Sequence, residues 1–85
     1  MHDIGRILKE ARMSLGMDIS EIARRTCINA RYLRAMEEGR FSIIPTVFDR
    51  GYLKIYANFL RIDAMMLLTR YEAEKTKTLV RTAPA

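Results

Sequence analysis

The residues best suited to bind another molecule are the large aromatic side chains between Pro45 and Leu60. Phe48 and Tyr52 lie four positions apart, so on a helix their side chains are neighbours on one face. Exposed aromatic side chains are typical anchors of protein–protein interfaces, because each buries a large apolar area. The spacing is therefore compatible with a protein-binding site in which Phe48 and Tyr52 are the anchors.

A structural role explains the same pattern. On a helix, the apolar residues of this segment form an arc wider than the stripe needed to pack against one core. A following helix could cover part of that arc, since apolar helical stripes usually face a core. Gly51 adds a hint of close backbone approach, because glycine inside a helix costs about 1 kcal/mol relative to alanine. The approaching backbone could belong to this domain or to a partner.

A second set of residues could bind nucleic acid. Arg31 and Arg34 lie near the start of a helix predicted over residues 30–38, where a DNA-reading helix contacts base edges and phosphates. Glu37 and Glu38 on the same helix are expected to offset this charge. No additional helix for dimerisation is evident, although specific repressors usually dimerise to span two half-sites. We therefore expect at most weak, nonspecific binding to nucleic acid.

The sequence offers no arrangement typical of an enzyme. His2 lies at the terminus without an identifiable acid–base partner. Cys27 lies among apolar residues and is expected to be a small buried side chain rather than a nucleophile or metal ligand. Neither a phosphate-binding glycine loop nor a metal-ligand spacing occurs. We predict no catalytic residue, no metal, no cofactor and no small-molecule substrate.

The composition limits the fold and the partners. A chain of 85 residues that is 49% hydrophobic can form one domain with a packed core. Its net charge of +5 permits binding to nucleic acid, an anionic membrane or an acidic protein, and selects none of them. The single cysteine favours a reducing compartment such as the cytoplasm. Neither a signal peptide nor a transmembrane run is recognised.

Helices must position these residues, and periodicity together with capping residues predicts where the helices lie. Three amphipathic segments separated by short turns predict helices over residues 4–15, 18–25 and 30–38. The second and third form a helix-turn-helix motif. The residues expected to cap or end these helices are Gly16, Asp18 with Glu21, Asn29 and Gly39.

Two further helices complete a predicted all-α, five-helix, repressor-like domain. Pro45 fits the first turn of the fourth helix, where its missing N–H is not needed. Asp63 is the expected cap of a short fifth helix. The remaining sequence is small and polar, as in linkers. We therefore predict a folded domain over residues 1–71 and a flexible C-terminal tail over residues 72–85 that is dispensable for folding.

Three stretches are particular enough for comparison with known families. They are Leu8-Lys-Glu-Ala-Arg12, Arg31-Tyr-Leu-Arg-Ala-Met-Glu-Glu-Gly39 and Arg50-Gly-Tyr-Leu-Lys-Ile-Tyr-Ala-Asn-Phe-Leu60. Many repressor-like domains share the first two, and the third is much more specific. With them, the sequence from about residue 4 to residue 71 resembles the cytoplasmic N-terminal domain of the RodZ cell-shape protein family.

The resemblance implies a noncatalytic adaptor. In that family the domain binds the actin-like filament protein MreB and precedes a basic juxtamembrane stretch, a transmembrane helix and a periplasmic region. The resemblance assigns filament contact to Phe48 and Tyr52, with Ile55 bordering the contact. It assigns Leu53, Tyr56 and Leu60 to the core.

Two alternatives stay open at this point. This chain stops at Ala85 without a membrane span, so it is either a truncated form or a short soluble relative. In the first case the full-length protein would lie at the cytoplasmic face of the bacterial inner membrane, held by a segment absent from this chain. The alternative function is a DNA-binding transcriptional regulator of the repressor-like helix-turn-helix class.

Overall fold

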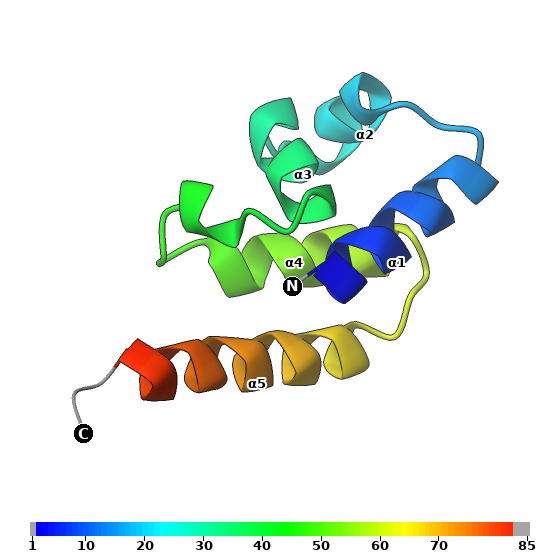
Figure 1. The fold of residues 1–85 in the computed structure, drawn as a ribbon. Helices are drawn as coiled ribbons and strands as arrows, with labels where there is room; N and C mark the ends of the chain where they lie inside the picture. The colour runs from blue at the N-terminus through cyan, green and yellow to red at the C-terminus, as the bar shows by residue number, and fades with distance from the viewer. Residues whose placement is uncertain (1, 83–85) are drawn as a thin grey trace.

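The computed structural model describes residues 2–82, and the side chains of residues 2–76. This part of the chain is entirely helical apart from its turns (Figure 1). The elements are α1 (His2–Ser14), α2 (Ile19–Thr26), α3 (Ala30–Glu37), the short 3-10 helix η1 (Phe41–Ile43), α4 (Asp49–Phe59) and α5 (Ala64–Thr82). The all-α fold with five α-helices that the sequence predicts is confirmed.

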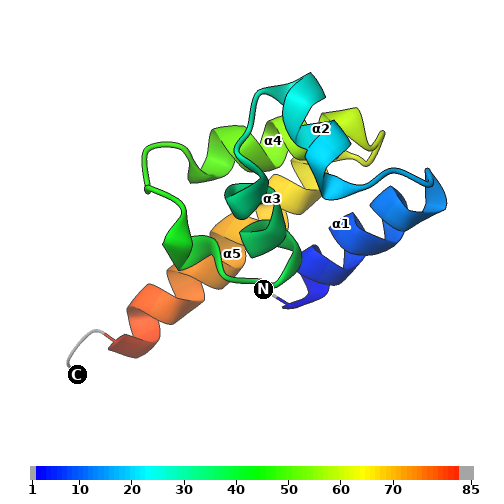
Figure 2. The ribbon, with the colours of Figure 1, turned by 90° about the horizontal axis from the view of Figure 1, so that it is seen from above.

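The helices are stacked so that α4 is covered on two sides. In Figure 1, α2 and α3 lie above α1 and α4, and α5 lies below them. Contacts join α4 to α5 and to α2, and join α1 to α3 and to α5. Seen from above, the C-terminal end of α5 extends past the other helices (Figure 2). Among the helices of residues 2–82, none covers the side of α4 on which Ile55 is exposed.

The predicted caps form at the starts of α2 and α3, except that the Glu21 carboxylate pairs with Arg25 and does not complete the capping box. The carboxylate of Asp18 accepts a hydrogen bond from the backbone N–H of Glu21 at 2.9 Å. The side chain of Asn29 accepts one from the N–H of Arg31 at 2.8 Å. These contacts satisfy amides that have no partner inside the helix. The glycines predicted to end helices adopt left-handed conformations, namely Gly16 (φ 66°) and Gly39 (φ 74°).

The core combines one face of each helix. Gly5 was not singled out by the sequence pattern, yet it lets α1 pack closely on the end of α3. A Cβ atom at Gly5 would overlap the carbonyl oxygen of Glu37, so only glycine fits there. The largest fully buried side chains are Ile4, Leu8, Ile22, Ile28, Leu33, Met36, Leu53, Tyr56 and Leu67.

α4 begins later than the position of Pro45 predicts. Pro45 lies in a separate turn, in which its carbonyl accepts a hydrogen bond from the N–H of Phe48 at 2.8 Å. The helix then starts at Asp49, with Phe48 as its N-cap residue. The connection before α4 therefore contains a distinct turn over residues 45–48.

α5 is longer than predicted. It continues to Thr82, whereas the sequence predicts a short helix that ends before residue 72. Glu72 and Lys75 form ion pairs with the start of α4, so tertiary contacts hold this helix as far as Lys75. The division into a domain over residues 1–71 and a tail over residues 72–85 stays a prediction. Residues 83–85 of the predicted tail lie outside the described residues. Within residues 2–82, no helix combines the length and apolar composition needed to span a membrane.

Some large apolar side chains lie outside the core. Leu15 at the end of α1 and Met65 and Met66 of α5 are exposed. Leu67, one position later, takes the buried position on α5 instead.

Candidate partner-binding surface

The predicted pair of aromatic residues lies at the start of α4. The ring of Phe48 stacks on the ring of Tyr52, with centroids 5.3 Å apart and planes at 10°. The backbone supports this arrangement, because the N–H of Tyr52 donates to the carbonyl of Phe48 at 2.9 Å. Phe48 is 46% exposed. The spacing of four residues therefore brings both rings together, and leaves the outer ring in solvent.

Tyr52 is less exposed than Phe48. Its ring also contacts Tyr32 of α3, with a centroid distance of 5.8 Å. Both tyrosines are partly buried and pack against the core. Phe48, Tyr52 and Tyr32 thus form an aromatic strip that runs from the start of α4 onto α3, and Tyr52 links the exposed end of this strip to the folded interior.

Further apolar side chains extend the exposed surface beyond the strip. Ile55 follows on the outer face of α4 and is 43% exposed. Val47, in the turn before α4, is 81% exposed, and Ile43 of η1 is also exposed. Sequence periodicity missed Val47 and Ile43 because neither belongs to an amphipathic helix. We call Val47, Phe48, Tyr52 and Ile55 the apolar face.

The opposite side of α4 is fixed to the core. Leu53, Tyr56 and Leu60 are buried, as the resemblance implies. The hydroxyl of Tyr56 donates a hydrogen bond to the carboxylate of Glu37 on α3. Burial, together with this hydrogen bond, raises the pKa of Tyr56 well above its ordinary value, so the hydroxyl stays protonated.

Glu37 also receives a second partner from α1. The guanidinium of Arg12 donates two hydrogen bonds to the Glu37 carboxylate, at 2.7 and 3.1 Å. The hydrogen bond to Glu37 raises the pKa of Arg12 above its ordinary value. Bidentate pairs of this kind restrict geometry as well as adding energy. Three helices therefore meet at Glu37, and the orientation of α4 is set by this contact.

A second polar cluster fixes the start of α4 against α5. Asp49 is only 4% exposed. Its carboxylate accepts hydrogen bonds from the Tyr71 hydroxyl, from Lys75 Nζ at 2.8 Å and from the Arg50 N–H at 2.7 Å. Burial alone would raise the pKa of Asp49, but these hydrogen bonds outweigh it and the pKa lies below its ordinary value. The apolar face is thus presented by a helix that is anchored at its first residue.

Replacing Lys75 by methionine should destabilise the domain by about 1–2 kcal/mol, because the buried carboxylate of Asp49 loses a charged hydrogen-bond donor. The Lys75 ammonium is partly exposed, which keeps this loss small. Ending the chain after Tyr71 removes the same ammonium group, so we expect a similar loss of stability, whereas the sequence alone predicts that the tail is dispensable for folding. Urea unfolding monitored by circular dichroism measures both effects.

The pH dependence of this effect has a definite sign. Because the folded state lowers the pKa of Asp49, the stability it contributes is fully present above the ordinary carboxyl pKa and is lost as the pH falls through the folded-state value. The difference between Lys75→Met and wild type should therefore shrink in acid. Lys54→Met is the matched control, since Lys54 is exposed and should change stability by less than about 0.5 kcal/mol. Equal stability of Lys75→Met and wild type at neutral pH would contradict the assignment.

The outer side of α3 is more basic than the sequence predicts. Arg31 and Arg34 are exposed, and neither forms an ion pair with any described side chain. Glu37 was expected to offset their charge, but its carboxylate turns inward to Arg12. Glu38 pairs with Arg40 at 3.7 Å. Glu37 therefore does not offset the charge of Arg31 and Arg34, contrary to the prediction.

Cys27 differs from its expected buried position. It ends α2 in a left-handed conformation (φ 62°) and is exposed. The neighbouring Ile28 occupies the buried position in the turn. A left-handed residue reverses the chain direction here, which turns the Cys27 side chain outward while Ile28 enters the core.

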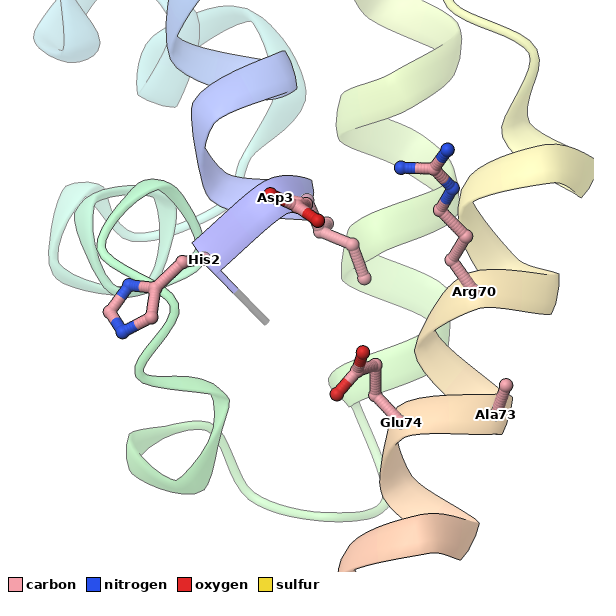
Figure 3. Close-up of a pocket in the computed structure, with 6 residues that line it drawn as sticks. His2, Asp3, Arg70, Ala73 and Glu74 are labelled. Atoms are coloured by element: carbon pink, nitrogen blue, oxygen red, sulfur yellow. The ribbon is translucent and has the colours of Figure 1, made fainter.

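His2 borders a hollow between α1 and α5. The hollow has a volume of about 410 Å³ and is lined by residues of both charges, with Asp3, Arg70 and Glu74 among them. In Figure 3 the imidazole of His2 points away from Arg70 and Glu74. Among the described residues, no group of three His, Cys, Asp or Glu side chains is placed to hold a metal ion.

The sequence shares its motifs with proteins of known families. Residues 7–67 match a helix-turn-helix domain family. The chain is 34% identical over 71 residues to the cytoskeleton protein RodZ of Streptococcus pneumoniae, covering 82% of this chain and 26% of that protein. It is 35% identical over 63 residues to the uncharacterized membrane protein YmfM of Bacillus subtilis, covering 73% and 22% respectively. The chain thus spans about a quarter of the length of these relatives. No solved structure matches it.

Proposed function

We propose that this chain, which belongs to the helix-turn-helix family of RodZ-like domains, is a noncatalytic adaptor that binds the actin-like filament protein MreB through its apolar face. The family membership itself confirms the resemblance that the sequence motifs indicate. Beyond family membership, we propose the binding partner and the surface that binds it. We also propose a role for the domain in cell-shape control.

The observation that carries the proposal is the contrast between the two sides of α4. The inner side is held by buried side chains and by the Glu37 and Asp49 clusters. The outer side keeps Phe48 and Ile55 nearly half exposed, although burying such side chains is normally favourable. A rigid helix with exposed aromatic and aliphatic anchors is the arrangement expected of a protein-binding surface.

The relatives support the wider context of this role. One is a cytoskeleton protein and the other is a membrane protein, and both are much longer than this chain. We propose that the full-length protein lies at the cytoplasmic face of the bacterial inner membrane. In that arrangement the membrane is reached through a segment outside this chain, and the helical domain recruits the filament.

Co-sedimentation with polymerised MreB tests the proposal. The 85-residue chain should pellet with the filaments in a saturable manner and should stay in the supernatant without them. Met65→Ala is the matched control, because Met65 is an exposed apolar residue on α5 beyond the opposite end of α4. This variant should bind like the wild type. Failure of the wild-type chain to pellet at saturating filament concentration would refute the proposed function.

A DNA-binding regulator is the second candidate, and the exposed arginines of α3 favour it. Arg31 and Arg34 lie on the helix that enters the major groove in helix-turn-helix proteins, and their side chains are free to contact phosphate. Specific operators are usually read by dimers, and the sequence of this chain marks no segment for dimerisation. This combination fits weak backbone contact better than sequence-specific recognition.

Any DNA binding should therefore be weak, indifferent to sequence and steeply reduced between about 50 and 200 mM salt, because phosphate contacts release counterions. Titration of random duplexes at both salt concentrations measures this. Arg31→Ala should lower the salt slope by about one unit. Nanomolar, salt-tolerant binding to one reproducible motif would instead make the domain a transcriptional regulator.

A further inference from the structure

One residue of α5 holds both ends of the segment that leads into α4. This segment runs from Phe41 of η1 to Asp49, the first residue of α4, and we call it the connector. The ring of Tyr71 packs against the ring of Phe41, with centroids 4.8 Å apart, and the Tyr71 hydroxyl donates a hydrogen bond to the Asp49 carboxylate. All three side chains are buried. These contacts form where α5 passes below η1 and the start of α4 (Figure 1).

Between its two ends the connector is held weakly by the rest of the fold. Of residues 42–48, all of which the structure describes, only Ile44 is buried. The backbone hydrogen bonds of the connector are local. The N–H of Ile44 donates to the carbonyl of Phe41 at 3.0 Å, and the N–H of Phe48 donates to the carbonyl of Pro45 at 2.8 Å. A segment with few buried side chains and exposed backbone is easily displaced, so the position of the connector depends on how its ends are held.

The connector carries two of the four residues of the apolar face. Val47 and Phe48 belong to it, and both are exposed. Phe48 directly precedes Asp49, so the hydrogen bond from Tyr71 is made one residue away from the exposed ring. Tyr71 itself is only 2% exposed and is not available to a partner. α5 can therefore act on the apolar face through the connector without contacting the partner itself.

We propose that Tyr71 is a positioning residue for filament binding, which holds the connector in the arrangement that the filament protein recognises. The inference rests on the proposed function, and adds that a side chain of α5 outside the contact surface sets the affinity. A partner that binds one arrangement of a segment binds more weakly when that arrangement is only partly populated. Releasing the connector from Tyr71 should therefore weaken binding although every residue of the apolar face is still present.

Tyr71→Phe tests the inference, because it removes the hydroxyl and keeps the ring that packs on Phe41. Lys75 Nζ and the Arg50 N–H still donate to Asp49, so the domain should stay folded. In co-sedimentation with MreB filaments, the Kd should rise by about three- to tenfold, since the remaining contacts keep the connector in place for part of the time. Amide hydrogen exchange in the connector should become faster in the unbound variant.

Tyr56→Phe is the matched control. Tyr56 is also a buried tyrosine whose hydroxyl donates to a carboxylate, but the acceptor is Glu37 of α3. This variant should also melt at a lower temperature than the wild type. Measured where all three proteins are folded, it should keep the wild-type exchange rates at the amides of Ile44 and Phe48, and the wild-type Kd.

Two results would overturn the inference and leave the proposed function intact. One is an unchanged Kd for Tyr71→Phe with filaments that bind the wild-type chain. The other is an equal rise in Kd for Tyr56→Phe, because the effect would then follow stability rather than the position of the connector. If the wild-type chain does not bind filaments, the proposed function and this inference both fail.

Discussion

Tyr56→Ala should be the most destabilising single substitution among the aromatic residues of α4, at a cost of about 3–5 kcal/mol. Tyr56 has no exposed surface, so removing the ring leaves a cavity between α4 and its neighbours. The change also removes a hydrogen bond to the Glu37 carboxylate, on which α1 and α3 converge. Because a domain of this size is only marginally stable, much of the variant should be unfolded at ambient temperature.

Tyr56→Phe separates the two parts of this effect. It keeps the ring in place and removes only the hydroxyl, so it should cost about 1.5–3 kcal/mol, the scale of a hydrogen bond to a charged group. Urea unfolding followed by circular dichroism measures both variants on one scale. If Tyr56→Ala were as stable as the wild type to within about 1 kcal/mol, the core position of Tyr56 and the importance of the Glu37 cluster would both be wrong.

The local features of this fold could be predicted because they depend on neighbouring residues. Asp18 and Asn29 cap helices through amides two or three positions away, and both caps form as the spacing indicates. Gly16 and Gly39 end helices in the conformation that glycine favours. In each case the interaction that decides the structure lies within one turn of the chain.

The features that were missed depend on contacts between distant segments. Beyond Tyr71, α5 is joined to the start of α4 by ion pairs from Glu72 and Lys75, which linker-like composition does not reveal. The free charge on α3 depends on Glu37 turning toward Arg12, a residue 25 positions earlier. Sequence periodicity does not show which distant residues these side chains contact.

The candidate site could be predicted only in part. The pairing of Phe48 with Tyr52 follows from their spacing, and the structure has the two rings stacked. Their unequal exposure could not be predicted, because it depends on Tyr32 of α3 covering one side of Tyr52. Val47 lies in a turn rather than a helix, so no helical pattern marks it as part of the exposed surface.

Phe48→Ala should leave the domain folded and reduce filament binding by at least about 2 kcal/mol, or about thirtyfold in Kd. The ring is nearly half exposed and fills no part of the buried core, so its loss should change the melting temperature little. Binding should fall because a stacked aromatic anchor at the edge of the apolar face is removed. Melting and co-sedimentation with MreB filaments on the same preparation give both quantities.

Tyr52→Ala supplies the contrast that makes this test specific. Tyr52 joins the strip to α3, so its loss should cost about 1–2 kcal/mol of stability in addition to binding, unlike the loss of Phe48. The ordering of melting temperatures should therefore be Phe48→Ala highest, Tyr52→Ala next and Tyr56→Ala lowest, which follows their increasing burial. A Phe48→Ala variant that melts early would place Phe48 in the core. One that stays folded and binds filaments normally would remove it from the interface, and the apolar face would then need another partner.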